Sequence, residues 1–326
     1  DRISGGGAPR FICTAYGSDE HHFHDAAQNL EEMLSASARV QTVDGAETAP
    51  SAVIDTDLDD EAYRAAVLRL KEEIAAGEVY QIVPSRTFSA PCADPLGAYA
   101  RLREVEPAGY RFFVAADGFT LLGASPETSV KLFRQDGGLA VEVKPIAGTR
   151  PRGASPDEDD RLEAEMRLDG KELAEHMMLL DLARNDVARI SLPGTRRVAK
   201  LLTVERFARV MHLVSSVQGR LALGLDAFDA LAACLNVGTL TGAPKIRAMQ
   251  LLREHERTRR GAYGGAIGWV NGGGLMDTAV VIRSALVKDG VAYVRAGAGV
   301  VHDSDPQAEA EETRRKASAL LGVLAR

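Results

Sequence analysis

Apolar side chains recur at three- and four-residue spacing along several stretches of the chain, which is the period of a helix with one buried face. The pattern predicts helices over Asp59–Gly77, Pro95–Val105, Arg161–Arg184, Leu225–Asn236, Ala243–Glu256 and Gln307–Ala325. Short runs bounded by turn residues predict strands between these helices. The runs are Val79–Pro84, Tyr110–Ala115, Phe119–Ala124, Ser129–Phe133, Leu139–Pro145, Ser215–Leu221, Gly264–Val270, Ala279–Val287 and Val291–Ala298.

Tight turns separate several of the predicted strands. Asp136-Gly137-Gly138 and Lys288-Asp289-Gly290 are two such turns, and each lies between apolar runs. A short turn of this kind joins antiparallel strands, because parallel strands need a long crossover connection. Hairpins with helices clustered between them predict an α+β fold rather than a doubly wound parallel sheet.

The amino-terminal part of the chain is less regular than the rest. Residues 1–55 contain a short predicted strand (Arg10–Tyr16), a helical pattern (His24–Met33) and a polar stretch that is typical of a linker. Dense helix and strand patterns follow to the last residue. We therefore divide the chain into an amino-terminal segment with its linker, residues 1–55, and one domain, residues 56–326. The first residue is Asp1 rather than Met, so we expect a processed or trimmed product.

Charge and cysteine content argue against several classes of function. The 326 residues are 45% hydrophobic with a formal net charge of −7, so a nucleic-acid-binding surface is not expected. Cys13, Cys92 and Cys234 have no short spacing, which argues against a disulfide framework or a zinc site and favours a reducing cytoplasm. We see no apolar run as long as a membrane span and no signal-peptide core. An anionic substrate would need local Arg, Lys or metal charge.

Carboxylates repeat at three-residue spacing on two separate predicted helices. Glu172 and Glu175 can share one helix face with His176, and Glu309 and Glu312 can share a face of the last helix. Taken alone, each pair is better explained as a solvated, salt-bridged surface stripe. Two helices that each offer carboxylates can also build an oxygen-rich cation site, and Mg²⁺ needs only one or two carboxylates with water or substrate oxygens.

Two glycine-rich segments suggest ligand binding but match no nucleotide motif. Gly238–Lys245 lacks the P-loop spacing, although a glycine loop that enters a helix can bind an anion as readily as it can form an ordinary turn. Ala296–Val301 is not GxGxxG and lies in no βαβ unit. Glu127 follows a proline at a strand end, which is more often a turn position. His212 lies in an apolar run, where a buried core histidine is the default interpretation.

The order and wording of these segments together resemble the chorismate-utilising enzymes, and among them the large subunit of anthranilate synthase. The resemblance runs from about residue 59 to the carboxyl end. It is carried by GEVYQIVPSR (77–86), LLGASPET (121–128), PIAGTRPRG (145–153), KELAEHMMLLDLARND (171–186), VMHLVSS (210–216), GTLTGAPKIRAMQ (238–250), RRGAYGGAIGW (259–269), MDTAVVIRSA (276–285), AGAGVVHDSDPQAEAEET (296–313) and RRKA (314–317).

The resemblance implies a fold and a set of residue roles. The fold is α+β, with two stacked antiparallel sheets, flanking helices and a buried site between them, and residues 1–55 are then a remnant of a longer amino-terminal region. Glu175 and Glu312 match Mg²⁺ ligands, supported by Glu172 and Glu309. The positions that hold the carboxylates of chorismate are matched by Gly148, Thr149, Thr239, Tyr263, Arg283, Gly297, Gly299 and Lys316. Glu127 matches the general acid for the departing hydroxyl, and His212 matches a residue of the later step that expels pyruvate.

Two positions separate members of this family. Members that add water have a lysine base where this chain has Gln81, so Gln81 favours ammonia as the nucleophile. The para-isomer synthases often have a lysine at Ala147, so Ala147 favours amination next to the ring carboxylate. The resemblance therefore implies Mg²⁺-dependent conversion of chorismate to anthranilate and pyruvate. The alternative is a 2-amino-2-deoxyisochorismate synthase of secondary metabolism that stops before pyruvate is lost, and His212 favours anthranilate.

The resemblance also implies a partner. None of the cysteines lies in the glycine-flanked elbow of a glutaminase, so we expect ammonia from a separate glutaminase subunit in a hetero-oligomer, or free ammonia. Family members contribute part of a tryptophan feedback site from the longer amino-terminal region, and Glu106–Arg111 departs from the family motif NPSPYM with Arg111 in place of Met. We therefore expect weak or absent inhibition by tryptophan.

Two further functions compete with chorismate amination. A phosphate-binding metal hydrolase could use the glycine loops and the carboxylates, and it would act on phosphate esters without binding chorismate. A non-catalytic partner of a glutaminase would need none of the predicted chemistry. The joint presence of Glu127, Glu175, Glu312 and Arg283 argues against that last interpretation.

Overall fold

The computed structural model describes residues 24–25, 27–28, 31–32, 53–207, 210–256 and 258–324. The chain divides into two compact units, Asp1–Gly45 and Ala46–Arg326. In the first unit the described positions are helical, as expected from the pattern over His24–Met33, whereas the strand predicted over Arg10–Tyr16 lies outside the described residues. The domain boundary at residue 55 stays a prediction. All elements below belong to the second unit.

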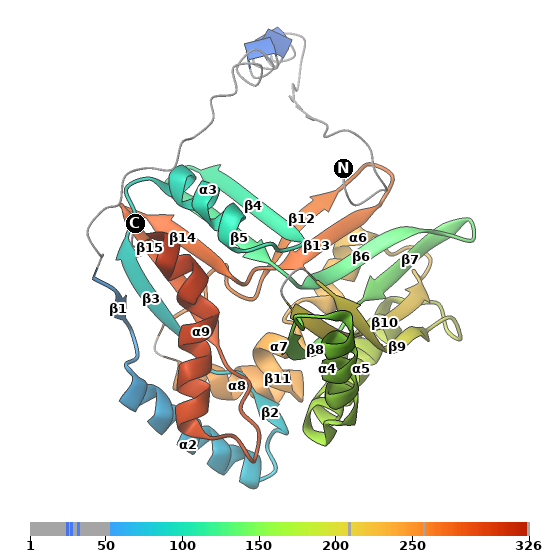
Figure 1. Cartoon of the computed structure of the whole chain (residues 1–326). Helices are drawn as coiled ribbons and strands as arrows, with labels where there is room; N and C mark the ends of the chain where they lie inside the picture. Colours follow the sequence, from blue (N-terminus) through green and yellow to red (C-terminus); the bar gives the residue numbers. More distant parts are fainter. Residues whose placement is uncertain are drawn as a thin grey trace. The chain divides into compact units, whose positions relative to one another are not determined.

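A six-stranded antiparallel sheet forms one half of this unit (Figure 1). Its strands, in spatial order, are β1 (Asp55–Thr56), β3 (Ser85–Pro91), β15 (Val291–Gly297), β14 (Ser284–Lys288), β5 (Phe119–Ser125) and β4 (Tyr110–Ala116). Helices α3 (Pro95–Val105) and α9 (Pro306–Leu324) pack on it. Alternate strand residues such as Phe88, Leu122 and Val294 are buried against Leu320 of α9, so the apolar face of the sheet and the apolar stripe of the helix form one core.

A seven-stranded antiparallel sheet forms the other half. Its strands run in the order β12 (Ala266–Val270), β13 (Met276–Val280), β6 (Thr128–Gln135), β7 (Gly138–Val143), β10 (Val210–Arg220) and β8 (Ile146–Pro151), and β9 (Arg197–Arg206) also pairs with β10. Three helices pack against this sheet, namely α4 (Pro156–Leu168), α5 (Gly170–Ile190) and α6 (Ala227–Cys234). Val141, Val217, Leu180 and Val187 belong to the core between this sheet, α5 and α6.

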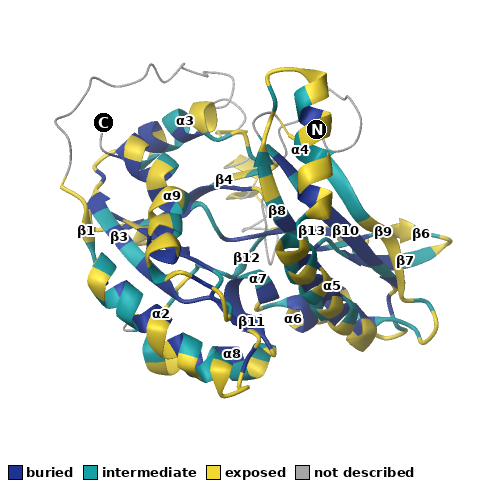
Figure 2. Ribbon diagram, turned by 60° about the horizontal axis from the view of Figure 1, so that its bottom comes forward, coloured by how far each residue is buried: buried dark blue, intermediate teal, exposed yellow. Residues whose placement is uncertain are grey.

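A third, smaller core lies among the remaining elements. These are α2 (Asp60–Ala75), β2 (Gln81–Ile82), α7 (Gly238–Thr241), β11 (Gly242–Ala243) and α8 (Lys245–His255). Tyr63 and Leu70 of α2 pack with Leu251 of α8 in this cluster. Figure 2 shows the amphipathic character of α2 and α9, which carry an exposed face and a buried face along their length. This core includes Ile82 of β2, and α7 packs against α8. Both β2 and α7 contribute to the site described below.

The predicted α+β class, with antiparallel sheets and flanking helices, is confirmed, but several element boundaries are wrong. The helix predicted over Arg161–Arg184 is two helices, because Asp169 ends α4 and caps α5 by accepting hydrogen bonds from the backbone N–H groups of Lys171 and Glu172. The strand predicted over Ala279–Val287 is two strands, β13 and β14, in different sheets. Strands β1, β3, β8, β9 and β11 were not predicted at all.

No helix in the described part of the chain is long and apolar enough to cross a membrane.

Candidate active site

A cavity of about 950 Å³ is lined by α5, α9 and strand ends from both sheets. Every site residue predicted from the sequence lines this one cavity. These residues are Gln81, Glu127, Gly148, Thr149, Glu172, Glu175, His212, Thr239, Tyr263, Arg283, Gly297, Gly299, Glu309, Glu312 and Lys316. The structure thus brings together segments that are far apart in the sequence, while the chemical roles of these residues stay predictions.

One wall of the cavity carries the predicted metal-binding glutamates. Burial raises the pKa of Glu175, and the negative charges of Glu172 and Glu312 raise it further. Burial also raises the pKa of Glu309. Among the described residues, no group of three His, Cys, Asp or Glu side chains lies close enough together to hold a metal ion. The wall is therefore a crowded set of oxygen donors rather than a closed coordination shell.

Cationic side chains pair with two of these glutamates. Arg150 Nη1 lies 3.1 Å from Glu172 Oε1, and the same guanidinium contacts Asp169 at 2.9 Å. Lys316 Nζ lies 2.7 Å from Glu312 Oε1, one turn along α9. The pairs partly balance the negative charge that α5 and α9 bring together.

Glu127 faces the cavity just beyond the end of β5. The hydroxyl of Thr239 donates a hydrogen bond of 2.7 Å to Glu127 Oε1. Burial raises the pKa of Glu127, while the hydrogen bond from Thr239 and the charge of Lys316 act in the opposite direction without cancelling it. A carboxyl group with a raised pKa can stay protonated near neutral pH and serve as an acid.

Gln81 is buried between Glu175 and a glycine segment. Its Nε2 donates to Glu175 Oε1 at 3.3 Å, and its Oε1 has no hydrogen-bond partner among the described residues. A Cβ atom on Gly299 would lie 2.6 Å from Gln81 Nε2, and a Cβ on Gly242, which has a φ of 131°, would lie 2.1 Å from the Gln81 carbonyl oxygen. Glycine is therefore required at position 242, where a Cβ would meet backbone, whereas a Cβ at position 299 would force the Gln81 amide to move.

Two cationic side chains, Arg283 and Lys316, also line the cavity. Arg283 lies between β13 and β14 with a left-handed φ of 49°, a conformation that is unfavourable for a residue with a long side chain. Its Nη1 donates to the Lys316 carbonyl oxygen at 3.0 Å, and Lys316 Nζ donates to the Gly297 carbonyl oxygen at 3.0 Å. Burial raises the pKa of the Tyr263 hydroxyl to about 12, so it is a neutral hydrogen-bond donor.

His212 of β10 faces the cavity beside β8 and is not enclosed in the core. Its Nδ1 lies 3.1 Å from the Gly148 carbonyl oxygen and 3.0 Å from Thr149 Oγ1. A carbonyl oxygen only accepts, so Nδ1 carries the proton and Nε2 of the neutral ring is an acceptor. Burial lowers the pKa of His212, which favours this neutral form. His176, by contrast, is buried with Nε2 2.7 Å from Ser215 Oγ and does not line the cavity.

The structure adds cavity residues that the sequence interpretation did not assign. Lys171 and Arg315 line the cavity next to the glutamates, and Arg295 and Asp303 line it elsewhere. Three of them lie within the segments that carry the family resemblance, which was the available signal for Lys171, Asp303 and Arg315. Arg295 directly precedes such a segment, and it is buried in the structure, so no local pattern singled it out.

The glycine loop Gly238–Lys245 does not offer its lysine to an anion. Lys245 Nζ forms a 2.6 Å ion pair with Asp186 of α5, and both side chains are largely buried. The loop contributes Thr239 to the cavity instead. This arrangement does not support the phosphate-hydrolase interpretation.

Known proteins resemble this chain over most of its length. Residues 8–322 match the family described as chorismate binding enzyme. The pyocyanine-specific anthranilate synthase component 1 of Pseudomonas aeruginosa is 53% identical over 309 residues, which are 93% of this chain and 56% of that protein. Anthranilate synthase component 1 of Vibrio cholerae is 55% identical over 277 residues, 83% of this chain and 53% of that protein. The chain thus spans about half the length of the curated relatives it matches.

A solved structure has the same fold. Anthranilate synthase component I from Streptococcus pneumoniae superposes with a TM-score of 0.81 at 37% sequence identity, and the match covers 91% of this chain and 66% of that chain.

Proposed function

The chain belongs to the chorismate binding enzyme family, and from that premise we propose that it carries the site for Mg²⁺-dependent amination of chorismate by ammonia, followed by pyruvate elimination to anthranilate. The observation that carries this proposal is the meeting of an acid, a set of glutamates and two cationic side chains in one cavity. The names of the relatives, anthranilate synthase component 1, support the same reaction.

Binding of a dianion by a chain with a net charge of −7 requires concentrated positive charge. Arg283 and Lys316 supply it in the cavity. A guanidinium can hold a carboxylate through two parallel hydrogen bonds, so Arg283 is the proposed partner of one substrate carboxylate. Tyr263 and the backbone at Gly297 also line the cavity.

Mg²⁺ would be held by Glu175 and Glu312, with Glu172 and Glu309 in support. The all-oxygen donor set suits this ion. The pKa of Glu175 is raised first by burial and then by the like charges of Glu172 and Glu312, which a divalent cation would neutralise. When bound, Mg²⁺ supplies positive charge to the ring carboxylate of chorismate and withdraws electron density as the nucleophile adds.

Glu127 is the proposed general acid. Hydroxide is a poor leaving group, so a positioned acid must protonate the ring hydroxyl as its C–O bond breaks. The carboxyl of Glu127 is suited to this step because burial raises its pKa and the hydrogen bond from Thr239 fixes its orientation.

Gln81 is the proposed contact for the nucleophile. A primary amide is no base at physiological pH, so it cannot activate water by removing a proton, whereas ammonia is nucleophilic without activation. The unpartnered Oε1 of Gln81 can accept an N–H of ammonia, while Nε2 stays on Glu175. This contact would orient the lone pair of ammonia toward the ring.

His212 is proposed to act in the second step. In that step the C–O bond between the ring and the enolpyruvyl group breaks as a ring proton is lost to the free Nε2 of the neutral imidazole, and the departing enolpyruvate takes up a proton to become pyruvate. The alternative product, 2-amino-2-deoxyisochorismate, corresponds to amination without this step.

The ammonia source is proposed to be a separate glutaminase subunit, because the relatives are named as one component of a larger enzyme. The test incubates the protein with chorismate, Mg²⁺ and an ammonium salt and identifies the products by mass. Anthranilate with pyruvate is the expected result. Accumulation of an aminated compound that keeps its pyruvyl group would support the alternative, and no consumption of chorismate would refute both.

A further inference from the structure

We propose that Arg260, held by Glu256, is a positioning residue that sets the geometry of Thr239 and Gln81 in the cavity. This inference rests on the proposed function, because it assigns those two side chains to the acid and to the nucleophile. Neither Arg260 nor Glu256 lines the cavity. They influence the cavity residues indirectly, because Arg260 binds backbone carbonyl groups close to them in the sequence.

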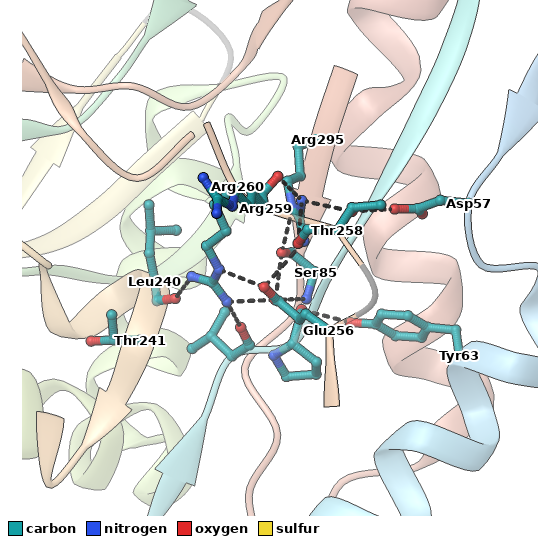
Figure 3. Close-up of polar contacts among 12 residues, drawn as sticks. Asp57, Tyr63, Ser85, Leu240, Thr241, Glu256, Thr258, Arg259, Arg260 and Arg295 are labelled. Carbon is teal, nitrogen blue, oxygen red and sulfur yellow. Dashed lines mark hydrogen bonds and ion pairs between the residues drawn. The ribbon is translucent and has the colours of Figure 1, made fainter. Parts of the chain in front are cut away.

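The carboxylate of Glu256 lies just beyond α8 at the centre of a buried polar network (Figure 3). Arg260 binds it with two hydrogen bonds, Nε to Oε2 at 2.9 Å and Nη2 to Oε1 at 2.7 Å. Ser85 donates to Oε1 from its backbone N–H at 2.9 Å and from its hydroxyl at 2.7 Å. Arg295 Nη2 donates to Oε2 at 3.1 Å. Both carboxylate oxygens are therefore fully engaged, and the Arg260 guanidinium has one orientation.

In that orientation Arg260 donates to two backbone carbonyl oxygens from different segments. Nη2 donates to Val83 at 2.7 Å, and Nη1 donates to Leu240. Val83 is two residues beyond Gln81, and Leu240 directly follows Thr239. One side chain thus joins the segment that supports Gln81 to the segment that supports Thr239. Figure 3 shows its contacts with Glu256 and Leu240.

The two supported side chains each bind a partly buried carboxyl group of the cavity. Thr239 donates to Glu127, and Gln81 donates to Glu175. Arg260 therefore supports, through Thr239 and Gln81, both the proposed acid and the proposed metal ligand. A shift of either segment would move these hydrogen bonds out of line, and small displacements of reacting groups cost large factors in rate.

A lysine at this position cannot form the same set of hydrogen bonds. The planar guanidinium serves the Glu256 carboxylate and the two carbonyls at once, whereas an ammonium group has three donors and no fixed fork. Arg260→Lys keeps the positive charge but cannot bind the Glu256 carboxylate and both carbonyl oxygens at the same time. We therefore expect the protein to fold and the hydrogen bond from Thr239 to Glu127 to weaken.

The consequence can be measured at Glu127. The groups that act on its carboxyl are Thr239 and Lys316, and both favour its ionised form. Loss of the Thr239 hydrogen bond raises the pKa of Glu127, so the acid stays protonated to higher pH and the alkaline limb of the kcat profile moves upward. A residue that only contributed to stability would leave that limb in place.

The experiment compares Arg260→Lys, Thr239→Val and the double variant. For Arg260→Lys we expect kcat with chorismate and ammonium to fall by about tenfold or more, with little change in KM for chorismate. We expect the alkaline limb to move up by about one pH unit in Thr239→Val. Arg260→Lys should move it in the same direction, and the double variant should move it no further than Thr239→Val alone. An unchanged limb in Arg260→Lys, or additive shifts, would overturn the proposal.

A matched control is available on α4. Arg167 also pairs with a glutamate four residues earlier, Glu163, and also donates to a backbone carbonyl, that of Leu202, at 2.8 Å. It does not line the cavity. Arg167→Lys should leave the limb unchanged.

A second readout needs no turnover. Carboxyl ¹³C NMR of protein labelled at glutamate Cδ, with Glu127→Gln for assignment, reports the pKa of Glu127 directly. Arg260→Lys should raise that pKa as Thr239→Val does. If the wild type does not consume chorismate, the proposed function fails, while this titration still decides the positioning role. If Arg260→Lys does not fold, Glu256→Gln must raise the pKa of Glu127 instead, and an unchanged value overturns the proposal.

Discussion

The hydroxyl of Thr239 lies 2.7 Å from Oε1 of Glu127 and donates a hydrogen bond to it, across a separation of 112 residues in the sequence. This contact joins α7 to the segment between β5 and β6. It lowers the pKa of a carboxyl group whose burial raises it, so the hydroxyl adjusts the protonation of the proposed acid as well as its orientation.

Replacing Glu127 should separate binding from chemistry. We expect Glu127→Gln to bind chorismate with nearly unchanged affinity and to lose at least about a hundredfold in kcat, because an amide cannot protonate the departing hydroxyl. Calorimetry with chorismate and a product assay measure the two effects. Unchanged turnover would remove Glu127 from its role.

The pH dependence of the wild type follows from the direction of the Glu127 shift. Activity requires the protonated carboxyl, so kcat should fall as the pH rises through its pKa. That limb should lie above the ordinary glutamate value of 4.5, and it should move to still higher pH in Thr239→Asp, because a second carboxylate disfavours ionisation of Glu127. A kcat profile measured at saturating chorismate and ammonia tests this expectation. A limb at or below 4.5 in the wild type would contradict it.

Gln81 should determine the affinity for ammonia. We expect Gln81→Met to raise KM for ammonia by about tenfold or more, since the buried amide oxygen can no longer accept an N–H, while KM for chorismate changes less. Steady-state kinetics with varied ammonium chloride tests this. Gln250→Met on the exposed side of α8 is the control, and an equal effect on both substrates would argue against a nucleophile contact.

Removal of a glutamate should weaken Mg²⁺ binding without unfolding the protein. Glu175→Gln should raise the dissociation constant for Mg²⁺ by about tenfold or more, because the ion loses a charged oxygen ligand. In EDTA the variant should melt no lower than the wild type, since Glu175 is crowded by Glu172 and Glu312. Thermal unfolding with and without Mg²⁺ measures both. A Mg²⁺-induced shift in melting temperature equal to that of the wild type would exclude Glu175 as a ligand.

The ion pair between Lys245 and Asp186 is expected to be structural. Lys245→Met leaves the Asp186 carboxylate buried without a partner, and should lower the free energy of unfolding by about 3 kcal/mol. Adding Asp186→Leu should recover most of that loss, because the uncompensated charge is then gone. Urea unfolding of the single and double variants gives both values. A stable Lys245→Met protein that has lost only its activity would instead point to a role for Lys245 in catalysis.

Local sequence patterns were sufficient to predict an element and its boundaries where one side of that element is apolar. The helix over Pro95–Val105 was predicted with the boundaries that the structure has, because its apolar stripe and its first-turn proline are both local signals. The hairpin turn at Lys288-Asp289-Gly290 was predicted for the same reason, and it joins β14 to β15. The family resemblance carried by the sequence segments indicated which residues would line the cavity.

Other features depend on contacts that no local pattern contains. Strand β3 escaped prediction because Arg86 occupies a core position in it, where it is fully buried and donates to Thr313, Asp60 and two backbone carbonyls. A guanidinium can be buried only where distant segments supply hydrogen-bond acceptors. The sequence around residue 86 alone therefore predicts an exposed segment rather than a buried strand.

The sequence by itself determined the fold class, most of the helices and many of the residues that line the cavity. The tertiary structure alone decided that the run over Ala279–Val287 crosses from one sheet to the other at Arg283, and that Arg260 joins the segments behind Gln81 and Thr239. The physical reason is that apolar periodicity encodes which face of one element is buried, whereas a site is built from hydrogen bonds between elements whose partners are far apart in the chain.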